Sequence, residues 1–110
     1  MKLAILFVIT LMTFQLTAQK TQTQEIKTSA ECGMCKDRIE DKLNYTKGVV
    51  FAELTVDTKI LKVRYNTKKI SLDVIKNILS SLGYDADEVK AVPSAVAKLP
   101  KCCQPGGMGN

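Results

Sequence analysis

Two short stretches in the middle of the chain alternate apolar and polar residues, and a short turn with three polar residues lies between them. Residues 49–56 and 61–65 show this period of two, which predicts strands, and so short a turn predicts an antiparallel hairpin. A hairpin with one apolar face is stable only when other elements cover that face, so this pair constrains the rest of the fold. The apolar side chains expected on the covered face are Val50, Ala52, Leu54, Val56, Leu61, Val63 and Tyr65.

The segments on either side of the hairpin supply the covering elements. Residues 24–28 predict a first short strand, and residues 35–45 predict a helix. After the hairpin, a second helix is expected between its N-cap Ser71 and Gly83, and residues 84–90 have the length of a return strand. The apolar stripes of the two helices are Cys35, Ile39 and Leu43, and Ile75, Ile78, Leu79 and Leu82. This order predicts an α+β fold, a ferredoxin-like βαββαβ sandwich in which a four-stranded antiparallel sheet carries two helices on one face.

Two cysteines, Cys32 and Cys35, lie three positions apart where a loop becomes the first helix. Unpaired N–H groups and the positive end of the helix dipole favour a thiolate there, and the thiolate is the form that binds metals and attacks disulfides. A second pair, Cys102 and Cys103, is adjacent in the chain. A disulfide within either pair would close a very short loop and would stabilise the fold little. Both pairs are therefore better suited to bind a metal or to act as redox couples.

The chain contains no histidine. Its absence excludes Ser-His and Cys-His catalytic pairs and imidazole metal ligands, so we expect a binding protein rather than an enzyme. Two thiolates are soft ligands that suit Cu(I) and similar ions, whereas a structural zinc site has four ligands. Zn(II) would therefore need Cys102 and Cys103 to join the first pair.

The beginning of the chain has the pattern of a secretory signal. A positive start precedes a mostly apolar run over residues 3–14, and the small residue Ala18 precedes the expected cleavage. The run is shorter than the ~20 residues that span a bilayer. We therefore divide the chain into a signal peptide (residues 1–18), a globular domain (19–91) and a tail that contains the second cysteine pair (92–110). The protein is expected to be exported, to the periplasm or as a secreted protein, without stable membrane insertion after cleavage.

The formal net charge is +5, but acidic and basic residues are mixed along the chain. Because no basic run is interleaved with aromatic residues, the sequence gives no support to nucleic-acid binding. We expect a monomer with a solvated, mildly cationic surface; steering toward an acidic patch on a partner protein is the second interpretation of this charge.

Several landmarks occur together in the order of one known family. A Cys-x-x-Cys motif follows the first strand, Lys47-Gly48-Val49 precedes the hairpin, and Leu82-Gly83-Tyr84-Asp85-Ala86 follows the second helix. Over residues 22–90 the chain resembles the heavy-metal-associated domain. That family includes copper chaperones, the N-terminal modules of metal-pumping ATPases and periplasmic mercury-binding proteins.

The resemblance implies that Cys32 and Cys35 hold a metal ion and that Tyr84 lies near the metal loop. It also implies that the ion is transferred or sequestered, with a metal-transporting ATPase or another metal-handling protein as partner. In one place the chain departs from the family pattern, because Ala30 stands where a methionine usually packs beneath the loop. Glu31 adds a negative charge beside the thiols. Cu(I) is the first candidate ion, and Hg(II), Zn(II) and Cd(II) stay open.

Four side chains near the motif or in the tail have two interpretations each. Met34 is a weak thioether ligand or a half-exposed hydrophobe, and Tyr84 is a site residue or part of the core. Cys102 and Cys103 form an accessory soft-metal site or a redox pair in a reactive tail.

The rival function is a thiol–disulfide redox protein that uses Cys32 and Cys35. Redox folds of that kind have a longer parallel core, which the predicted hairpin does not provide. The sequence therefore favours metal binding.

Overall fold

The structure is a computed structural model that describes residues 20–104. The predicted signal peptide, residues 1–18, and the end of the predicted tail, residues 105–110, lie outside the described residues. Within residues 20–104, no helix combines the length and the apolar character that crossing a membrane requires. The elements are β1 (Thr21–Lys27), α2 (Gly33–Asn44), β2 (Val49–Thr55), β3 (Ile60–Asn66), α3 (Leu72–Leu82), α4 (Pro93–Ala97) and the 3₁₀ helix η2 (Lys101–Cys103).

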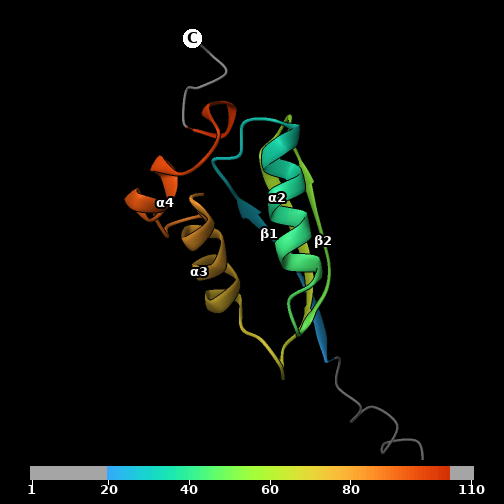
Figure 1. Ribbon diagram of the computed structural model, residues 1–110. Coiled ribbons are helices and arrows are strands. Elements are labelled where there is room, and N and C mark those ends of the chain that lie inside the picture. Colours follow the sequence, from blue (N-terminus) through green and yellow to red (C-terminus); the bar gives the residue numbers. More distant parts are fainter. Residues whose placement is uncertain (1–19, 105–110) are drawn as a thin grey trace, which may run out of the picture.

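The three strands form one antiparallel sheet in the order β1-β3-β2. β2 and β3 are the predicted hairpin, with Ala52 opposite Val63 and Leu54 opposite Leu61. Figure 1 shows α2 and α3 on the same face of this sheet, where α2 packs on β2 and also contacts α3. The helices cover the apolar face of the strands, and this arrangement confirms the ferredoxin-like class.

The predicted fourth strand is wrong in detail: within the described part of the chain, residues 84–90 do not extend the sheet. Ala86 makes only isolated pairings, with Thr28 and with Val89. Asp87 has a φ of 51°, and this left-handed conformation ends the extended run. Its carboxylate accepts a hydrogen bond from the Lys27 N–H (2.9 Å), in place of a carbonyl on a neighbouring strand. The Asp87 N–H also donates to the Lys27 carbonyl (2.9 Å), so the segment meets β1 only at the end of that strand. Within residues 20–104 the sheet therefore has three strands.

An irregularity in β2 changes which side chains face the core. Val49 and Phe51 pair with adjacent residues of β3, Tyr65 and Arg64, so Val50 is an extra residue between them. Val50 is 54% exposed, although the alternation predicts it on the covered face. A bulge shifts the alternation by one residue, and an apolar pattern with a period of two does not reveal where that happens.

Local signals set the ends of α3 as predicted. The Ser71 hydroxyl oxygen accepts a hydrogen bond from the Val74 N–H at the first turn. Gly83 follows the last turn with a φ of 106°, which favours glycine. The core-facing side of α3 differs from the predicted stripe, because Lys76 is buried, with its ammonium 3.1 Å from the Glu88 carboxylate.

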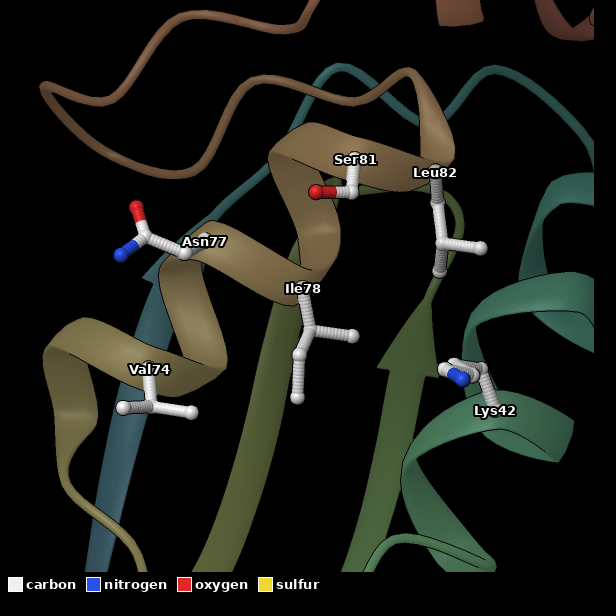
Figure 2. A pocket seen from close by; sticks show the side chains of 6 residues that line it. All are labelled: Lys42, Val74, Asn77, Ile78, Ser81 and Leu82. Carbon is white, nitrogen blue, oxygen red and sulfur yellow. The ribbon is translucent and has the colours of Figure 1, made fainter.

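Ile78 and Leu82, which the stripe places in the core, are half-buried and line a groove between α2 and α3. The groove has a volume of about 470 Å³. Figure 2 shows the six side chains that line the groove. Besides Ile78 and Leu82 they are Lys42, Val74, Asn77 and Ser81. None of these residues is a cysteine, so the groove is separate from the candidate metal ligands.

The segment after α3 packs back onto the domain. Figure 1 shows α4 beside α3 and the chain that follows it close to the start of α2, and η2 contacts α2. Leu99, between α4 and η2, is only 4% exposed. This packing brings the second cysteine pair to the same end of the molecule as the Cys-x-x-Cys motif.

Candidate metal centre

The first turn of α2 presents the Cys-x-x-Cys pair. The helix begins at Gly33, two residues earlier than predicted, so Cys32 is its N-cap residue and Cys35 lies in its first turn. The Cys32 backbone is extended (φ −153°), and its carbonyl accepts a hydrogen bond from the Lys36 N–H. The two sulfurs lie 3.7 Å apart as free thiols, Cys32 half-buried and Cys35 fully buried. One thiol therefore reaches the surface while the other is held in place by the core.

The position of Cys32 at the helix start changes its acidity. Its partial burial disfavours the thiolate, but the backbone N–H of Cys35, the Cys102 thiol and the backbone N–H of Met34 stabilise it. The hydrogen bonds outweigh the effect of burial, and the pKa of Cys32 is lowered from 9.0 to about 7. Near neutral pH a large share of Cys32 is therefore thiolate, the form that binds a soft metal ion.

Two hydroxyl side chains hold the loop before the motif. The Thr28 hydroxyl donates to the Lys59 carbonyl (2.8 Å), and its oxygen accepts a hydrogen bond from the Ala30 N–H (3.2 Å). The Ser29 hydroxyl oxygen accepts a hydrogen bond from the Asp85 N–H (2.9 Å). Sequence reasoning missed both roles; the signal was two hydroxyl residues in a loop just before the motif, where such side chains often bond backbone groups.

The charge beside the thiols is already paired. Glu31 precedes Cys32, and its carboxylate lies 3.2 Å from the Lys59 ammonium. Ala30, at the position where the family usually has methionine, is fully buried beneath the loop. The loop therefore carries no isolated negative charge next to the motif, and a small side chain fills the space below it.

Tyr84 lies under the thiols rather than at the surface. It is fully buried, and within residues 20–104 its hydroxyl oxygen has no nitrogen or oxygen partner. Burial raises its pKa, and the Cys35 and Cys103 thiols that it faces raise it further. The core interpretation of Tyr84 is confirmed, because the side chain is fully buried in the hydrophobic cluster. Its role at the site stays a prediction, which the nearby Cys35 and Cys103 thiols support.

The tail brings its two cysteines to the same place. The Cys103 sulfur lies 3.9 Å from the Cys32 sulfur, and the Cys102 sulfur lies 3.9 Å from that of Cys103. The Cys102 sulfur is also 3.9 Å from the Met34 thioether, whose side chain is 51% exposed. Burial raises the pKa of the Cys103 thiol, which is only 1% exposed.

All the side chains that the sequence suggests for the site thus gather at the start of α2. They are Cys32, Cys35, Met34, Tyr84, Cys102 and Cys103. The sulfurs of Cys32, Cys102 and Cys103 all lie within 4.8 Å of one another, close enough to bind one ion together. Such a donor set is soft and fits a soft cation far better than Mg²⁺ or Ca²⁺, which prefer oxygen.

A family model for the heavy-metal-associated domain matches residues 27–85, more than half of the chain. The chain belongs to the heavy-metal-associated domain family. The match includes Cys32, Cys35 and Tyr84, and it ends before the segment that carries Cys102 and Cys103. The resemblance noted in the sequence is confirmed, and the second cysteine pair lies beyond the matched domain.

Individual relatives agree with this assignment. A zinc-transporting ATPase of Synechocystis sp. is 38% identical over 72 residues, which are 66% of this chain and 10% of that protein. A copper chaperone CopZ of Staphylococcus aureus is 33% identical over 54 residues, which are 49% of this chain and 79% of that protein. The heavy-metal-associated domain described here thus corresponds to most of a small chaperone but to about a tenth of the ATPase.

A solved structure has the same fold. The N-terminal domain of a potential copper-translocating P-type ATPase from Bacillus subtilis, in its Cu(I)-loaded state, is 31% identical, with a TM-score of 0.58. The comparison covers 61% of this chain and 85% of that one. The ferredoxin-like arrangement of this heavy-metal-associated domain is therefore shared with a metal-binding module.

Proposed function

We propose that this protein binds one Cu(I) ion through Cys32 and Cys35 and then transfers or sequesters it, without acting as an enzyme. The observation that carries the proposal is the pair of free thiols 3.7 Å apart at the start of α2. One of them is half-exposed and ionises near pH 7, so the site is ready to take up a soft cation. The copper chaperone and the Cu(I)-loaded domain among the similar proteins support copper as the ion.

Transfer follows from the exposure of one ligand and the burial of the other. Thiols of a partner can reach an ion on Cys32 from solvent, while Cys35 is held in the first turn by the core. The natural partner of such a site is the metal-binding module of a metal-transporting ATPase, a class to which two of the similar proteins belong. We propose that the protein acts as a monomer.

Export completes the proposal. Its support is the charged, apolar and small-residue pattern of residues 1–18, which lie outside the described residues. The exported protein would act in the periplasm or as a secreted protein. Sequencing the N-terminus of the protein from its native host tests this, because cleavage predicts a start near Gln19 and an intact Met1 would contradict it.

A competitive metal titration tests the binding site. The reduced chain from residue 19 onward, which contains every described element, is titrated with Cu(I) against a coloured chelator, and then with Hg(II), Zn(II) and Cd(II). Cys32→Ser/Cys35→Ser should weaken Cu(I) binding by more than roughly 100-fold, because it removes both proposed ligands of the helix start. Full-strength binding by that variant would move the site elsewhere, and tighter binding of another ion would replace copper in the proposal.

Two observations favour the redox alternative: the Cys32 and Cys35 sulfurs lie 3.7 Å apart, and the pKa of Cys32 is lowered. The sheet of residues 20–104 is antiparallel throughout, unlike the parallel core expected for that kind of redox fold. A disulfide reductase assay on the metal-free protein separates the two functions. Sustained turnover would favour electron exchange over metal binding.

A further inference from the structure

The second cysteine pair is held against the metal loop by packing that begins well before it. The Val92 N–H donates to the Ser80 carbonyl at the end of α3 (3.0 Å), and α4 follows. Leu99 packs so closely on Gly83 that a Cβ at that glycine would lie 3.0 Å from its side chain. The Gln104 amide donates to the Leu99 carbonyl (3.1 Å), which closes the turn around η2. The position of Cys102 and Cys103 is therefore built by the fold.

The separations of the sulfurs suit a shared ion. With metal–sulfur bonds of about 2.3 Å, a tetrahedral ion separates its sulfur ligands by ~3.8 Å. The Cys32 sulfur lies 3.7 Å from that of Cys35 and 3.9 Å from that of Cys103, and the Cys102 sulfur is within 4.8 Å of both Cys32 and Cys103. Cys35 is not part of the group of three sulfurs within 4.8 Å, so Cys32 is the residue that the Cys-x-x-Cys pair shares with Cys102 and Cys103.

The fully buried Tyr84 hydroxyl is a second, independent indication. It has no hydrogen-bond partner within the described residues, and it lies near enough to Cys35 and Cys103, one thiol from each pair, for both to raise its pKa. A buried hydroxyl without a partner is costly, whereas an O–H that donates to a metal-bound thiolate is satisfied. Metal binding by these cysteines would therefore give the Tyr84 hydroxyl an acceptor that it otherwise lacks.

We infer that Cys102 and Cys103 are ligands of the same ion as Cys32 and Cys35, so that the tail closes an open two-thiolate site into a four-thiolate one. This inference rests on the proposed function. While the tail is docked, Cys102 and Cys103 take the coordination positions that would otherwise be open to the thiols of a partner; once it detaches, those thiols can reach the ion on Cys32. The closed site suits soft ions that take three or four sulfur ligands, and the tail must detach before the ion leaves.

A titration with Cd(II) tests the number of ligands, because the ultraviolet absorbance of each thiolate–cadmium bond adds to the total. The reduced wild type, in excess over Cd(II), should show about twice the absorbance per bound ion of Cys102→Ser/Cys103→Ser, as expected for four thiolates against two. Lys101→Ser, an exposed change in the same 3₁₀ helix, is the matched control and should behave as the wild type. Sedimentation should show that the loaded wild type is a monomer.

Equal absorbance in the wild type and the tail variant would overturn this inference and leave the proposed function standing. A loaded wild type that is dimeric would overturn it too, because the second chain would then supply the extra thiolates. If neither protein binds Cd(II) or Cu(I), the proposed function fails together with the inference.

A second measurement tests the position of the tail without any metal. In Cys35→Ala/Cys102→Ala, glutathione disulfide should oxidise Cys32 and Cys103 to one disulfide within the chain, as it is itself reduced to two glutathione thiols. Mass spectrometry of the digested protein identifies the linked peptides. Glutathione attached separately to each cysteine would contradict the docked position of the tail.

Discussion

The sulfur of Cys32 lies 3.9 Å from the sulfur of Cys103, 71 positions away in the chain. Cys32 is half-buried at the start of α2, and Cys103 is buried in η2, the last described element. Their contact joins a motif of the heavy-metal-associated family to a segment that the family model does not match. The chemistry of the site therefore depends on how firmly this segment is docked.

The first prediction concerns the rate of ion release. Cys102→Ser/Cys103→Ser should pass Cu(I) to an excess of a coloured chelator roughly tenfold faster than the wild type, the lower end of what a lost partner costs a metal site. The physical reason is that the tail thiols no longer block approach to the ion. Stopped-flow absorbance measures the rate, with Lys101→Ser as control, and equal rates would argue against a closing tail.

The second prediction concerns the pH dependence of thiol reactivity. The pKa of Cys32 is lowered to about 7, so in the metal-free protein its alkylation by iodoacetamide should rise through pH 7 and level off above it. In the urea-unfolded chain the rate should keep rising toward the ordinary thiol pKa of 9.0. Peptide mass spectrometry measures each cysteine separately, and the buried Cys103 should react more slowly. A folded-state midpoint near 9 for Cys32 would be inconsistent with stabilisation by the helix start.

The third prediction separates the two roles of Tyr84. Tyr84→Phe should leave the free energy of unfolding unchanged or raise it by about 1 kcal/mol, because the ring stays in the core and the lost hydroxyl has no hydrogen-bond partner in the described structure. Tyr84→Ala should cost about 3–5 kcal/mol, as expected for a large buried side chain. Urea denaturation measures both.

The same pair of variants also reports on the metal. If the Tyr84 hydroxyl donates to a metal-bound thiolate, Tyr84→Phe should weaken Cu(I) binding roughly fivefold while leaving stability almost unchanged. Unchanged Cu(I) affinity in Tyr84→Phe would leave Tyr84 with a packing role alone.

The fourth prediction concerns the contact between α3 and the tail. Gly83 has a φ of 106°, and a Cβ there would lie 3.0 Å from the Leu99 side chain and 3.1 Å from the Ala95 carbonyl oxygen. Gly83→Ala should therefore lower the free energy of unfolding by roughly 1–3 kcal/mol and loosen the tail. Gly33→Ala is the control, because it also replaces glycine by alanine but no atom of the described residues lies within 4 Å of the added Cβ. It should change the free energy of unfolding by less than about 1 kcal/mol. Thermal or urea unfolding of both variants gives the comparison, and similar losses would refute the steric argument.

Sequence patterns were reliable wherever the determining interactions are local. Ser71 caps α3 and Gly83 ends it, because a cap and a left-handed turn depend on residues within a few positions. The β2–β3 hairpin followed from alternation around a short turn. The pattern failed at Val50, where a bulge shifts the alternation, and at residues 84–90, where the left-handed Asp87 ends the extended run beside the end of β1.

The sequence by itself determined the class of fold, the family and the presence of two thiols at a helix start. Periodicity, helix caps and the Cys-x-x-Cys spacing each depend only on residues close together in the chain. Only the tertiary structure decided that Cys102 and Cys103 lie beside that pair and that the unpartnered Tyr84 hydroxyl is buried near the thiols. It also decided that Lys76 is buried against acidic side chains. The physical reason is that a periodic pattern shows which face of an element is covered but not which distant segment covers it. That choice depends on packing summed over the whole core.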